Sequence, residues 1–266
     1  MSKFDGAGAA LVTGAGGSIG SAVAAALVQR GCSKLVLADI STTALEATQK
    51  HLLAGYDSGS RPLQLLLVKT DIRLEESVDA LLKTAVDRFG AIHYFANCAG
   101  IMIEPAATLD TQPQDFLTLS TVNQRGTWLS VRAEVRQLLK QEREPFGAGS
   151  SRGSIVNVSS VQGLATQPGM VAFAAASHGI VGLTRSTALD YIDSGIRFNC
   201  VCPAATESAF LKSPTFQEAS KDCLPAGGVN QPSEVANAIV FLLSPDASAI
   251  NGVSLPVDRG WTLYHH

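Results

Sequence analysis

The sequence has 266 residues, of which 46% are apolar and 16% charged, and its formal charge is −3. A chain of this length and apolar content can bury a sizeable core, which excludes a disordered or fibrous protein. The charge is slightly negative and no basic run occurs, so we expect no nucleic acid partner. No apolar stretch reaches the roughly 18 residues that a membrane span requires, so we expect no membrane partner.

The cysteines and the first residues bear on the cellular compartment. There are five cysteines, an odd number, and no segment resembling a signal peptide opens the chain, so we expect a reduced protein in the cytoplasm. Cys200 and Cys202 alternate along an apolar run without a further Cys or His cluster, so we expect buried thiols and no metal site. His265 and His266 are either native residues or the start of a tag.

Short β-type runs alternate with helical segments along the whole chain, a pattern typical of βαβ units around a parallel sheet. No change in composition marks a domain boundary, and the polar segment 143–153 is predicted to be a connecting loop. We predict strands at residues 8–13, 34–39, 63–68, 91–96, 153–159, 196–202 and 252–257. We predict helices at residues 18–30, 42–55, 75–88, 113–141, 170–192, 206–223 and 232–244.

A glycine-rich turn follows the first predicted strand. The strand runs into Thr13-Gly14-Ala15-Gly16-Gly17-Ser18-Ile19-Gly20, and an alanine-rich helix comes next. Such a turn at a helix N-terminus presents backbone N–H groups that can bind a pyrophosphate. The alternative is a tight turn that only packs the helix against the strand.

The second predicted strand ends in Asp39, 19 residues after Gly20. A carboxylate there can accept hydrogen bonds from both ribose hydroxyls of an adenosine and repels a 2′-phosphate, which favours NAD(H) over NADP(H). Residue 40 is Ile and no Arg or Lys follows in the turn, although a cation from elsewhere in the fold would still allow NADP(H). The alternative is that Asp39 only caps the next helix.

More motifs follow in order along the chain. They are Val68-Lys69-Thr70-Asp71, Asn97-Cys98-Ala99-Gly100, Asn123, the run from Gly153 to Ser160, Pro203-Ala204, and Asn251 to Trp261. On these motifs and the glycine turn, the chain resembles the short-chain dehydrogenase/reductase family over nearly its whole length. Ser18 stands where that family usually has the middle glycine of the turn.

The resemblance implies an α/β fold, a Rossmann-type doubly wound parallel sheet of seven strands flanked by helices, with strand order 3-2-1-4-5-6-7. It implies a single NAD(P)-binding domain over residues 1–266 and a homodimer or homotetramer formed through the long helices and the closing strand. By the same resemblance, Asp71 holds the adenine amino group and Ser208 offers a hydroxyl to the carboxamide. The predicted cofactor-binding residues are Gly14, Gly16, Ser18, Ile19, Asp39, Asp71, Ile72, Asn97, Ala99, Gly100, Pro203, Ala204 and Ser208.

Two family residues are missing from the expected catalytic site. In the family a Ser holds the substrate oxygen, a Tyr transfers the proton, and a Lys four residues later lowers the pKa of the Tyr and binds the nicotinamide ribose. Thirteen residues after Ser160 the chain has Phe173, and four residues later it has Ser177. No Tyr occurs between residues 94 and 191 and no Lys between residues 140 and 212, so no shifted alignment restores the pair.

Because phenylalanine has no titratable proton, the usual interconversion of alcohol and ketone is not expected, and losing general acid–base help typically costs ~10²- to 10⁴-fold in rate. Asn123 and Ser160 remain and are predicted to position the substrate, or to be polar residues with a structural role only. His178 is turned away from Phe173 on the same helix and is not expected to replace the proton donor. The candidate catalytic residues are Asn123, Ser160, Phe173 and Ser177.

Three functions remain open. The first is hydride delivery to an iminium-type cation, which needs no proton, and the second is a cyclisation such as a Diels–Alder or Pictet–Spengler reaction that depends on positioning. Both occur together in the fungal indole-alkaloid reductase/Diels–Alderases, which this chain resembles in lacking the Tyr and Lys. The third is a dinucleotide-binding scaffold without activity, and an ordinary carbonyl reductase with a substitute proton donor is a further alternative. A bulky hydrophobic substrate is suggested by the apolar residues Met170, Phe210, Leu211 and Phe216, for which core packing is the alternative.

Overall fold

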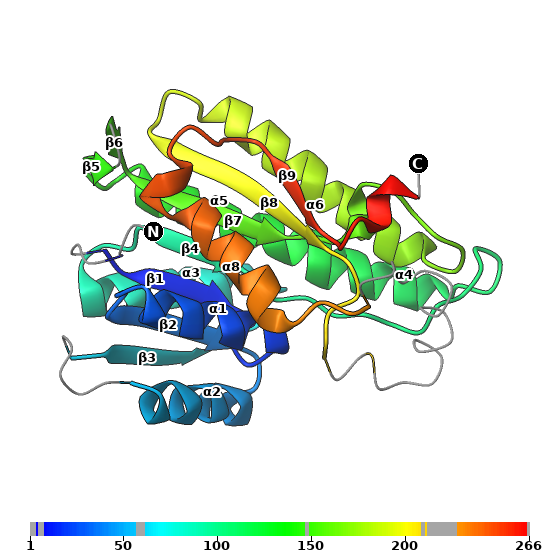
Figure 1. The fold of residues 1–266 in the computed structure, drawn as a ribbon, viewed down its shortest axis with the longest axis horizontal. Coiled ribbons are helices and arrows are strands. Elements are labelled where there is room, and N and C mark those ends of the chain that lie inside the picture. The colour runs from blue at the N-terminus through cyan, green and yellow to red at the C-terminus, as the bar shows by residue number, and fades with distance from the viewer. Residues whose placement is uncertain are drawn as a thin grey trace.

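The computed structural model describes residues 4, 8–56, 62–146, 149–208, 211 and 228–264. Seven parallel strands form one sheet in the order β3-β2-β1-β4-β7-β8-β9, which confirms the predicted strand order (Figure 1). The strands are β1 Ala10–Thr13, β2 Lys34–Asp39, β3 Gln64–Lys69, β4 Tyr94–Asn97, β7 Gly153–Val158, β8 Ile196–Pro203 and β9 Ser254–Val257.

Helices cover both faces of this sheet, as the alternation of strands and helices predicts. They are α1 Ser18–Gln29, α2 Thr42–Ala54, α3 Glu75–Phe89, α4 Pro113–Leu119, α5 Gly126–Leu138, α6 Val171–Asp190 and α8 Pro232–Leu243. Consecutive residues of a strand point to opposite faces. Val12 of β1 therefore joins the core beneath α1, α2 and α8, whereas its neighbour Leu11 joins the core beneath α3 and α5. Cys200 and Cys202 are free and buried under α6, as predicted.

The long helix predicted over residues 113–141 is divided into three parts. Between α4 and α5 the backbone forms a π-helical turn over Ser120–Arg125, which contains Asn123. A π-turn adds a residue to one turn of helix and is frequent at functional sites. Both polar atoms of the Asn123 side chain bond the backbone of Ile101, which holds this turn against the segment that follows β4.

Two other predictions fail locally. The expected loop over residues 143–153 contains a small antiparallel hairpin, β5 Glu144–Phe146 and β6 Gly149–Ser151, because its two ends are extended and pair with each other. The helix predicted over residues 206–223 is wrong at its start, because Thr206 forms a β-bridge with Asn230. Residues 207 and 208 form a bend, and the rest of that segment, apart from residue 211, lies outside the described residues, as do Phe210, Phe216, His265 and His266.

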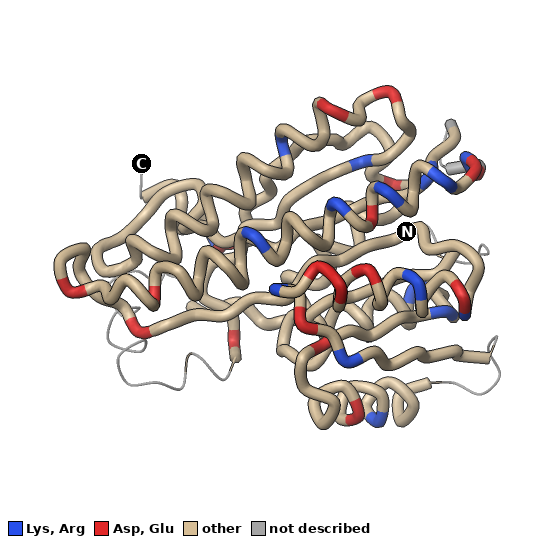
Figure 2. The backbone as a smooth tube through the Cα atoms, turned by 180° about the vertical axis from the view of Figure 1, so that it is seen from behind, with Lys and Arg blue, Asp and Glu red and all other residues tan. Residues whose placement is uncertain are grey.

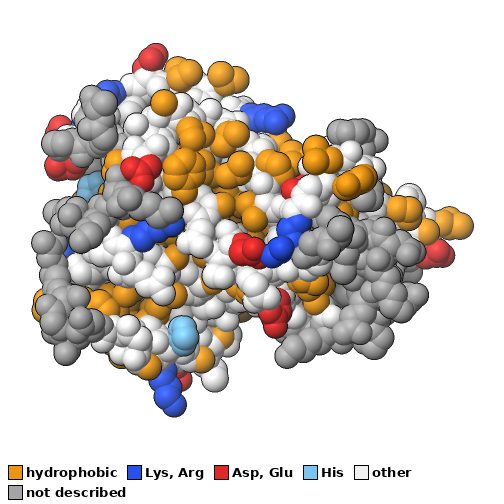
Figure 3. All heavy atoms as spheres, viewed as in Figure 1, with side chains coloured by type: hydrophobic (Ala, Val, Ile, Leu, Met, Phe, Trp, Pro, Cys, Tyr) orange, Lys and Arg blue, Asp and Glu red, His pale blue; other side chains and the backbone are white. Residues whose placement is uncertain are grey.

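The surface carries charges of both signs. Figure 2 shows acidic and basic residues along the helices of the rear face. Arg132 pairs with Glu75 and Arg136 with Asp79, and these ion pairs join α5 to α3. On the face seen in Figure 3, the described residues likewise show interspersed charges and no broad patch of one sign. Among the described residues, no helix combines the length and the apolar character that a membrane span requires.

Candidate dinucleotide and substrate site

Two cavities lie side by side at the carboxyl ends of the central strands, where ligands of open parallel sheets usually bind. One has a volume of about 300 Å³ and is lined by Asp39 at the end of β2, and we call it the Asp39 cavity. The other has a volume of about 200 Å³ and is lined by Phe173 of α6, and we call it the Phe173 cavity. Their shared wall consists of Gly14, Gly17, Cys98, Ala99, Gly100 and Ile101.

The glycine turn is packed so tightly that a side chain fits at neither Gly14 nor Gly20. Gly14 has φ +67°, and a Cβ there would lie 2.6 Å from the Ala99 nitrogen. A Cβ at Gly20 would lie 2.1 Å from the Gly14 oxygen. No side chain caps the N-terminus of α1, whose first two residues, Ser18 and Ile19, line the Phe173 cavity. The turn therefore combines close backbone packing with an uncapped helix N-terminus, the arrangement that binds anions.

Asp39 ties the end of β2 to this turn. Its Oδ2 accepts a hydrogen bond from the Gly16 nitrogen at 3.0 Å and its Oδ1 accepts one from the Ser41 nitrogen at 2.9 Å. The cap of α2 is Ser41, whose Oγ accepts from the Ala44 nitrogen, so the alternative role of Asp39 as the helix cap does not apply. The Asp39 carboxylate is left at the edge of the cavity that it lines.

Asp71 lines the same cavity and forms an ion pair with Arg73. The Arg73 Nη2 lies 2.6 Å from Asp71 Oδ2, and this bond lowers the pKa of the Asp71 carboxyl. Arg125 donates a hydrogen bond to the Arg73 carbonyl at 2.7 Å. The positive charge of Arg73 is therefore neutralised by Asp71 within the cavity wall. Among the described residues, the Asp39 carboxylate bonds backbone nitrogens and forms no ion pair.

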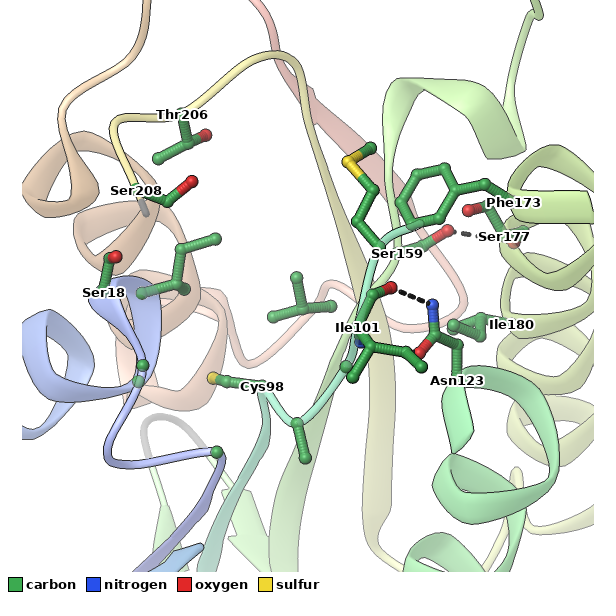
Figure 4. Close-up of a pocket in the computed structure, with 18 residues that line it drawn as sticks. Ser18, Cys98, Ile101, Asn123, Ser159, Phe173, Ser177, Ile180, Thr206 and Ser208 are labelled. Carbon is green, nitrogen blue, oxygen red and sulfur yellow. Dashed lines mark hydrogen bonds between the residues drawn. The ribbon is translucent and has the colours of Figure 1, made fainter. Parts of the chain in front are cut away.

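The Phe173 cavity has two walls from distant parts of the chain (Figure 4). Phe173, Ser177 and Ile180 of α6 lie on one side with Asn123, and Ser18, Thr206 and Ser208 lie on the other. Ile101, Met102 and Val158 add apolar surface. The cavity is thus mainly apolar and has hydroxyl groups on both sides.

The two serines after β7 have different environments. Ser159 lines the Phe173 cavity, and its Oγ donates a hydrogen bond to the Ser177 carbonyl at 2.9 Å. Ser160 is buried and does not belong to the cavity lining. Its Oγ accepts from the Gln162 nitrogen at 3.2 Å and lies 3.4 Å from the Pro203 carbonyl. The substrate-positioning role of Ser160 stays a prediction.

Comparison with known proteins identifies the family. The family model described as enoyl-(acyl carrier protein) reductase matches residues 14–262. A short-chain dehydrogenase of Aspergillus ruber, fogB, is 34% identical over 272 residues, which cover 96% of this chain and 97% of that protein. The chain is a member of the short-chain dehydrogenase/reductase family.

Other members and solved structures agree with this assignment. The cyclohexanol dehydrogenase of an Acinetobacter species is 36% identical over 257 residues, which cover 95% of this chain and 94% of that protein. The structure of levodione reductase matches with a TM-score of 0.86 and 29% identity, covering 97% of this chain and 99% of that one. The 3-ketoacyl-(acyl-carrier-protein) reductase of Brucella melitensis, solved with NADH, matches with a TM-score of 0.84 and 28% identity, covering 96% of this chain and 98% of that one.

The structure of this short-chain dehydrogenase/reductase brings most of the predicted cofactor residues to the two cavities. Those that line a cavity are Gly14, Ser18, Ile19, Asp39, Asp71, Ile72, Ala99, Gly100 and Ser208. Four others do not belong to the lining of either cavity. The Gly16 nitrogen bonds Asp39, Asn97 is buried, the Pro203 carbonyl accepts the Ser160 hydroxyl, and the Ala204 nitrogen bonds the Val257 carbonyl.

Several lining residues were not predicted. Arg73 follows Asp71 by two residues, a spacing that could have placed it at the same strand end. Ser159 and Thr206 also line the Phe173 cavity, and they lie one and two positions before the predicted residues Ser160 and Ser208. Ile101 and Met102 follow the Asn97-Cys98-Ala99-Gly100 motif directly, so an extension of that motif could have found them.

Titratable groups are almost absent from the described lining of the Phe173 cavity. Cys98 is the one such side chain, and burial raises the pKa of its thiol to about 12. His178 is not part of the lining, because its Nδ1 lies 2.9 Å from the Ala174 carbonyl of its own helix. The described lining therefore contains no side chain that exchanges a proton near neutral pH.

Proposed function

We propose that this short-chain dehydrogenase/reductase binds a nicotinamide dinucleotide across the two cavities and prefers NAD(H) to NADP(H). The glycine turn, into which no Cβ fits at Gly14 or Gly20, and the uncapped α1 suit a pyrophosphate. The Asp39 carboxylate suits a ribose diol and repels a 2′-phosphate. Arg73 does not offset this repulsion fully, because it is paired with Asp71. When bound, the dinucleotide supplies a hydride.

We propose further that the substrate accepts the hydride without accepting a proton. The observation that carries this proposal is the described lining of the Phe173 cavity, where the single titratable group is a thiol with a pKa of about 12. Reduction of a ketone requires a proton for the alkoxide oxygen. The carbon of an iminium ion gains a hydride and C=N⁺ becomes CH–N, which is a neutral amine, so charge and atoms balance without a proton donor.

The walls of the Phe173 cavity suit a substrate that combines an apolar ring system with a positive charge. Phe173, Met102 and Ile180 provide apolar surface for a bulky ring system. Ser177 is neutral, so a cationic substrate meets no like charge at this position. The Ser159 Oγ donates a hydrogen bond to the Ser177 backbone carbonyl, which holds the Ser159 hydroxyl in a defined position at the wall.

The same cavity would also orient a reactive substrate for cyclisation, such as a Diels–Alder or Pictet–Spengler reaction. Holding two reacting groups in a near-attack geometry accelerates a reaction without any proton transfer. A wall of apolar residues opposite the hydroxyl groups of Ser18, Thr206 and Ser208 supports this proposal, because it offers two chemically different sides to a substrate. We assign both activities to specialised, alkaloid-type metabolism in the cytoplasm, since cyclic iminium ions are typical of alkaloid chemistry.

The test uses two bicyclic substrates of similar shape. N-Methyl-3,4-dihydroisoquinolinium is a permanent iminium cation, and α-tetralone is the matched ketone. With NADH, we expect the protein to reduce the iminium ion above the uncatalysed rate, with one amine formed per NADH consumed and little change between about pH 6 and pH 9, and to leave the ketone unreacted. Faster reduction of the ketone would support a carbonyl reductase with another proton donor. Dinucleotide binding without conversion of either compound would support the scaffold function.

We also propose that the protein is a homodimer or homotetramer formed through its long helices and closing strand. A groove of about 430 Å³ between the α4–α5 segment and α6 is lined by Leu117, Trp128 and Leu183, and Trp128 is 43% exposed. A second copy would cover these apolar side chains. Light scattering at micromolar concentrations should give at least twice the monomer mass, and a monomer throughout would contradict this proposal.

A further inference from the structure

Arg259 has an unusual backbone conformation. It follows β9 and has φ +50°, the one positive φ of a residue other than glycine within the described part of the chain. The left-handed region is disfavoured for a side chain with a Cβ and is adopted where surrounding interactions impose it. The neighbouring residue Gly260, with φ +86°, adopts the same region without this cost.

The Arg259 side chain makes interactions that account for its conformation. Its Nη2 lies 2.6 Å from Oε1 and 2.5 Å from Oε2 of Glu234, in the first turn of α8. Its Nε donates to Asn230 Oδ1 at 3.2 Å. Both charged side chains are partly exposed, so the ion pair itself adds little to stability. The planar guanidinium instead fixes the geometry, because its hydrogen bonds hold the Glu234 and Asn230 side chains in one relative arrangement.

Asn230 connects this arrangement to the loop after β8. It is buried, and its Nδ2 donates to the Val257 carbonyl at 2.6 Å. Its backbone nitrogen donates to the Ala205 carbonyl at 2.8 Å, and its carbonyl accepts from the Glu207 nitrogen at 2.9 Å. Every polar group of Asn230 is therefore bonded, two of them to the loop over residues 205–207.

This loop carries one wall of the Phe173 cavity. Thr206 and Ser208 line that cavity opposite Phe173, and neither lines the Asp39 cavity (Figure 4). Thr206 is further held by a hydrogen bond from its Oγ1 to the Ala204 carbonyl at 2.9 Å. A chain of direct contacts thus leads from Arg259 through Asn230 to the residues of one cavity only.

We propose that Arg259 is a positioning residue for the Phe173 cavity, which would take the nicotinamide half of the dinucleotide. By holding Asn230, it fixes the loop over residues 205–208, so that the Thr206 and Ser208 hydroxyls are in place before the nicotinamide end binds. Ordering these side chains in advance removes a cost from binding. The inference rests on the proposed binding of a dinucleotide, and it predicts an effect confined to one half of that ligand.

The test compares NADH with ADP-ribose, which lacks the nicotinamide, by calorimetric titration. Arg259→Gly removes the guanidinium and accepts the left-handed backbone without strain, so the variant should fold with a similar Tm. We expect the Kd for NADH to rise about five-fold or more and the Kd for ADP-ribose to stay within about two-fold. Arg259→Lys, which keeps the charge and loses the planar contacts, should show the same selective loss. It provides the comparison if the glycine variant fails to fold.

Arg88→Ala on α3 is the matched control, since it removes an exposed arginine outside the lining of both cavities. It should bind both ligands as the wild type does. Unchanged NADH affinity in both Arg259 variants would overturn the positioning role, as would equal weakening of NADH and ADP-ribose, which indicates a general structural effect. If the unmodified protein binds neither ligand, the proposed dinucleotide function fails, and the role of Arg259 fails with it.

Discussion

Phe173 and Ser177 lie one helical turn apart on α6 and line the same cavity, where the Ser177 carbonyl accepts a hydrogen bond from the Ser159 hydroxyl at 2.9 Å. The two positions that are predicted to replace the family's Tyr and Lys therefore contribute to one continuous wall. Neither side chain can donate a proton at neutral pH or carry a positive charge. The chemistry of this wall consequently depends on shape and hydroxyl groups.

The first prediction concerns the choice of dinucleotide. Asp39→Asn keeps the size of the side chain and removes the charge that repels a 2′-phosphate, so the preference for NADH over NADPH should fall by about ten-fold or more. Asp39→Ala also loses the hydrogen bonds from the Gly16 and Ser41 nitrogens and should weaken the binding of both dinucleotides. Calorimetric titration of each variant measures this. A wild type that binds NADPH more tightly than NADH would contradict the assignment of Asp39.

The second prediction concerns the glycine turn. Gly14→Ala places a Cβ 2.6 Å from the Ala99 nitrogen in a residue with φ +67°, so we expect loss of dinucleotide binding and a lower Tm. Gly182→Ala in α6 is the control, because no atom outside the adjoining helix backbone lies within 4 Å of the added Cβ and alanine favours a helix by roughly 0.5–1 kcal/mol. Thermal unfolding with and without NADH compares the two. Normal NADH binding by the Gly14 variant would show that the turn does not hold the ligand.

The third prediction concerns Glu134, which is fully buried in α5. Its Oε2 accepts from Asn97 Nδ2 at 3.1 Å, its Oε1 has no hydrogen-bond partner among the described residues, and burial raises the pKa of this carboxyl from 4.5 to about 8. Between about pH 4.5 and pH 8, Glu134 therefore keeps a proton in the folded protein that it releases in the unfolded chain. Stability should therefore fall as the pH rises from about 5 to 8 and level off above that.

Glu134→Gln removes this titration and keeps the shape of the side chain. The free energy of unfolding of the wild type relative to the variant should fall by about 3 kcal/mol between pH 5 and pH 8. Urea unfolding at several pH values measures the difference. A difference that does not change with pH would mean that Glu134 has the same pKa in the folded and unfolded states.

The repeated alternation of strand and helix was enough to predict the sheet, because parallel strands that are buried on both sides appear as short apolar runs. Burial over all four residues of β1 illustrates this. The π-helical turn at Ser120–Arg125 could not be predicted, since its sequence has the ordinary periodicity of a helix and the contact that holds Asn123 comes from Ile101, far away in the chain.

The same difference between local motifs and long-range contacts applies to the candidate site. Gly14 and Asp39 were found because short local motifs placed them at strand ends. The contacts of Arg259 with Asn230 and Glu234 could not be predicted, because they join residues 29 and 25 positions apart and depend on a backbone angle that no sequence pattern reports. Long-range contacts of this kind follow from the packed fold and not from local spacing.

The most direct test of the central claim restores the family pair in this chain. Phe173→Tyr with Ser177→Lys should bind NADH at least as tightly as the wild type, because the lysine can contact the nicotinamide ribose. It should reduce the iminium ion at least about ten-fold more slowly, because the new ammonium group repels the cation, and it should gain reduction of the matched ketone. Parallel initial rates of the wild type and the double variant on both substrates provide the measurement. Slower iminium reduction with new ketone reduction is the predicted result, and faster iminium reduction by the double variant would contradict the account.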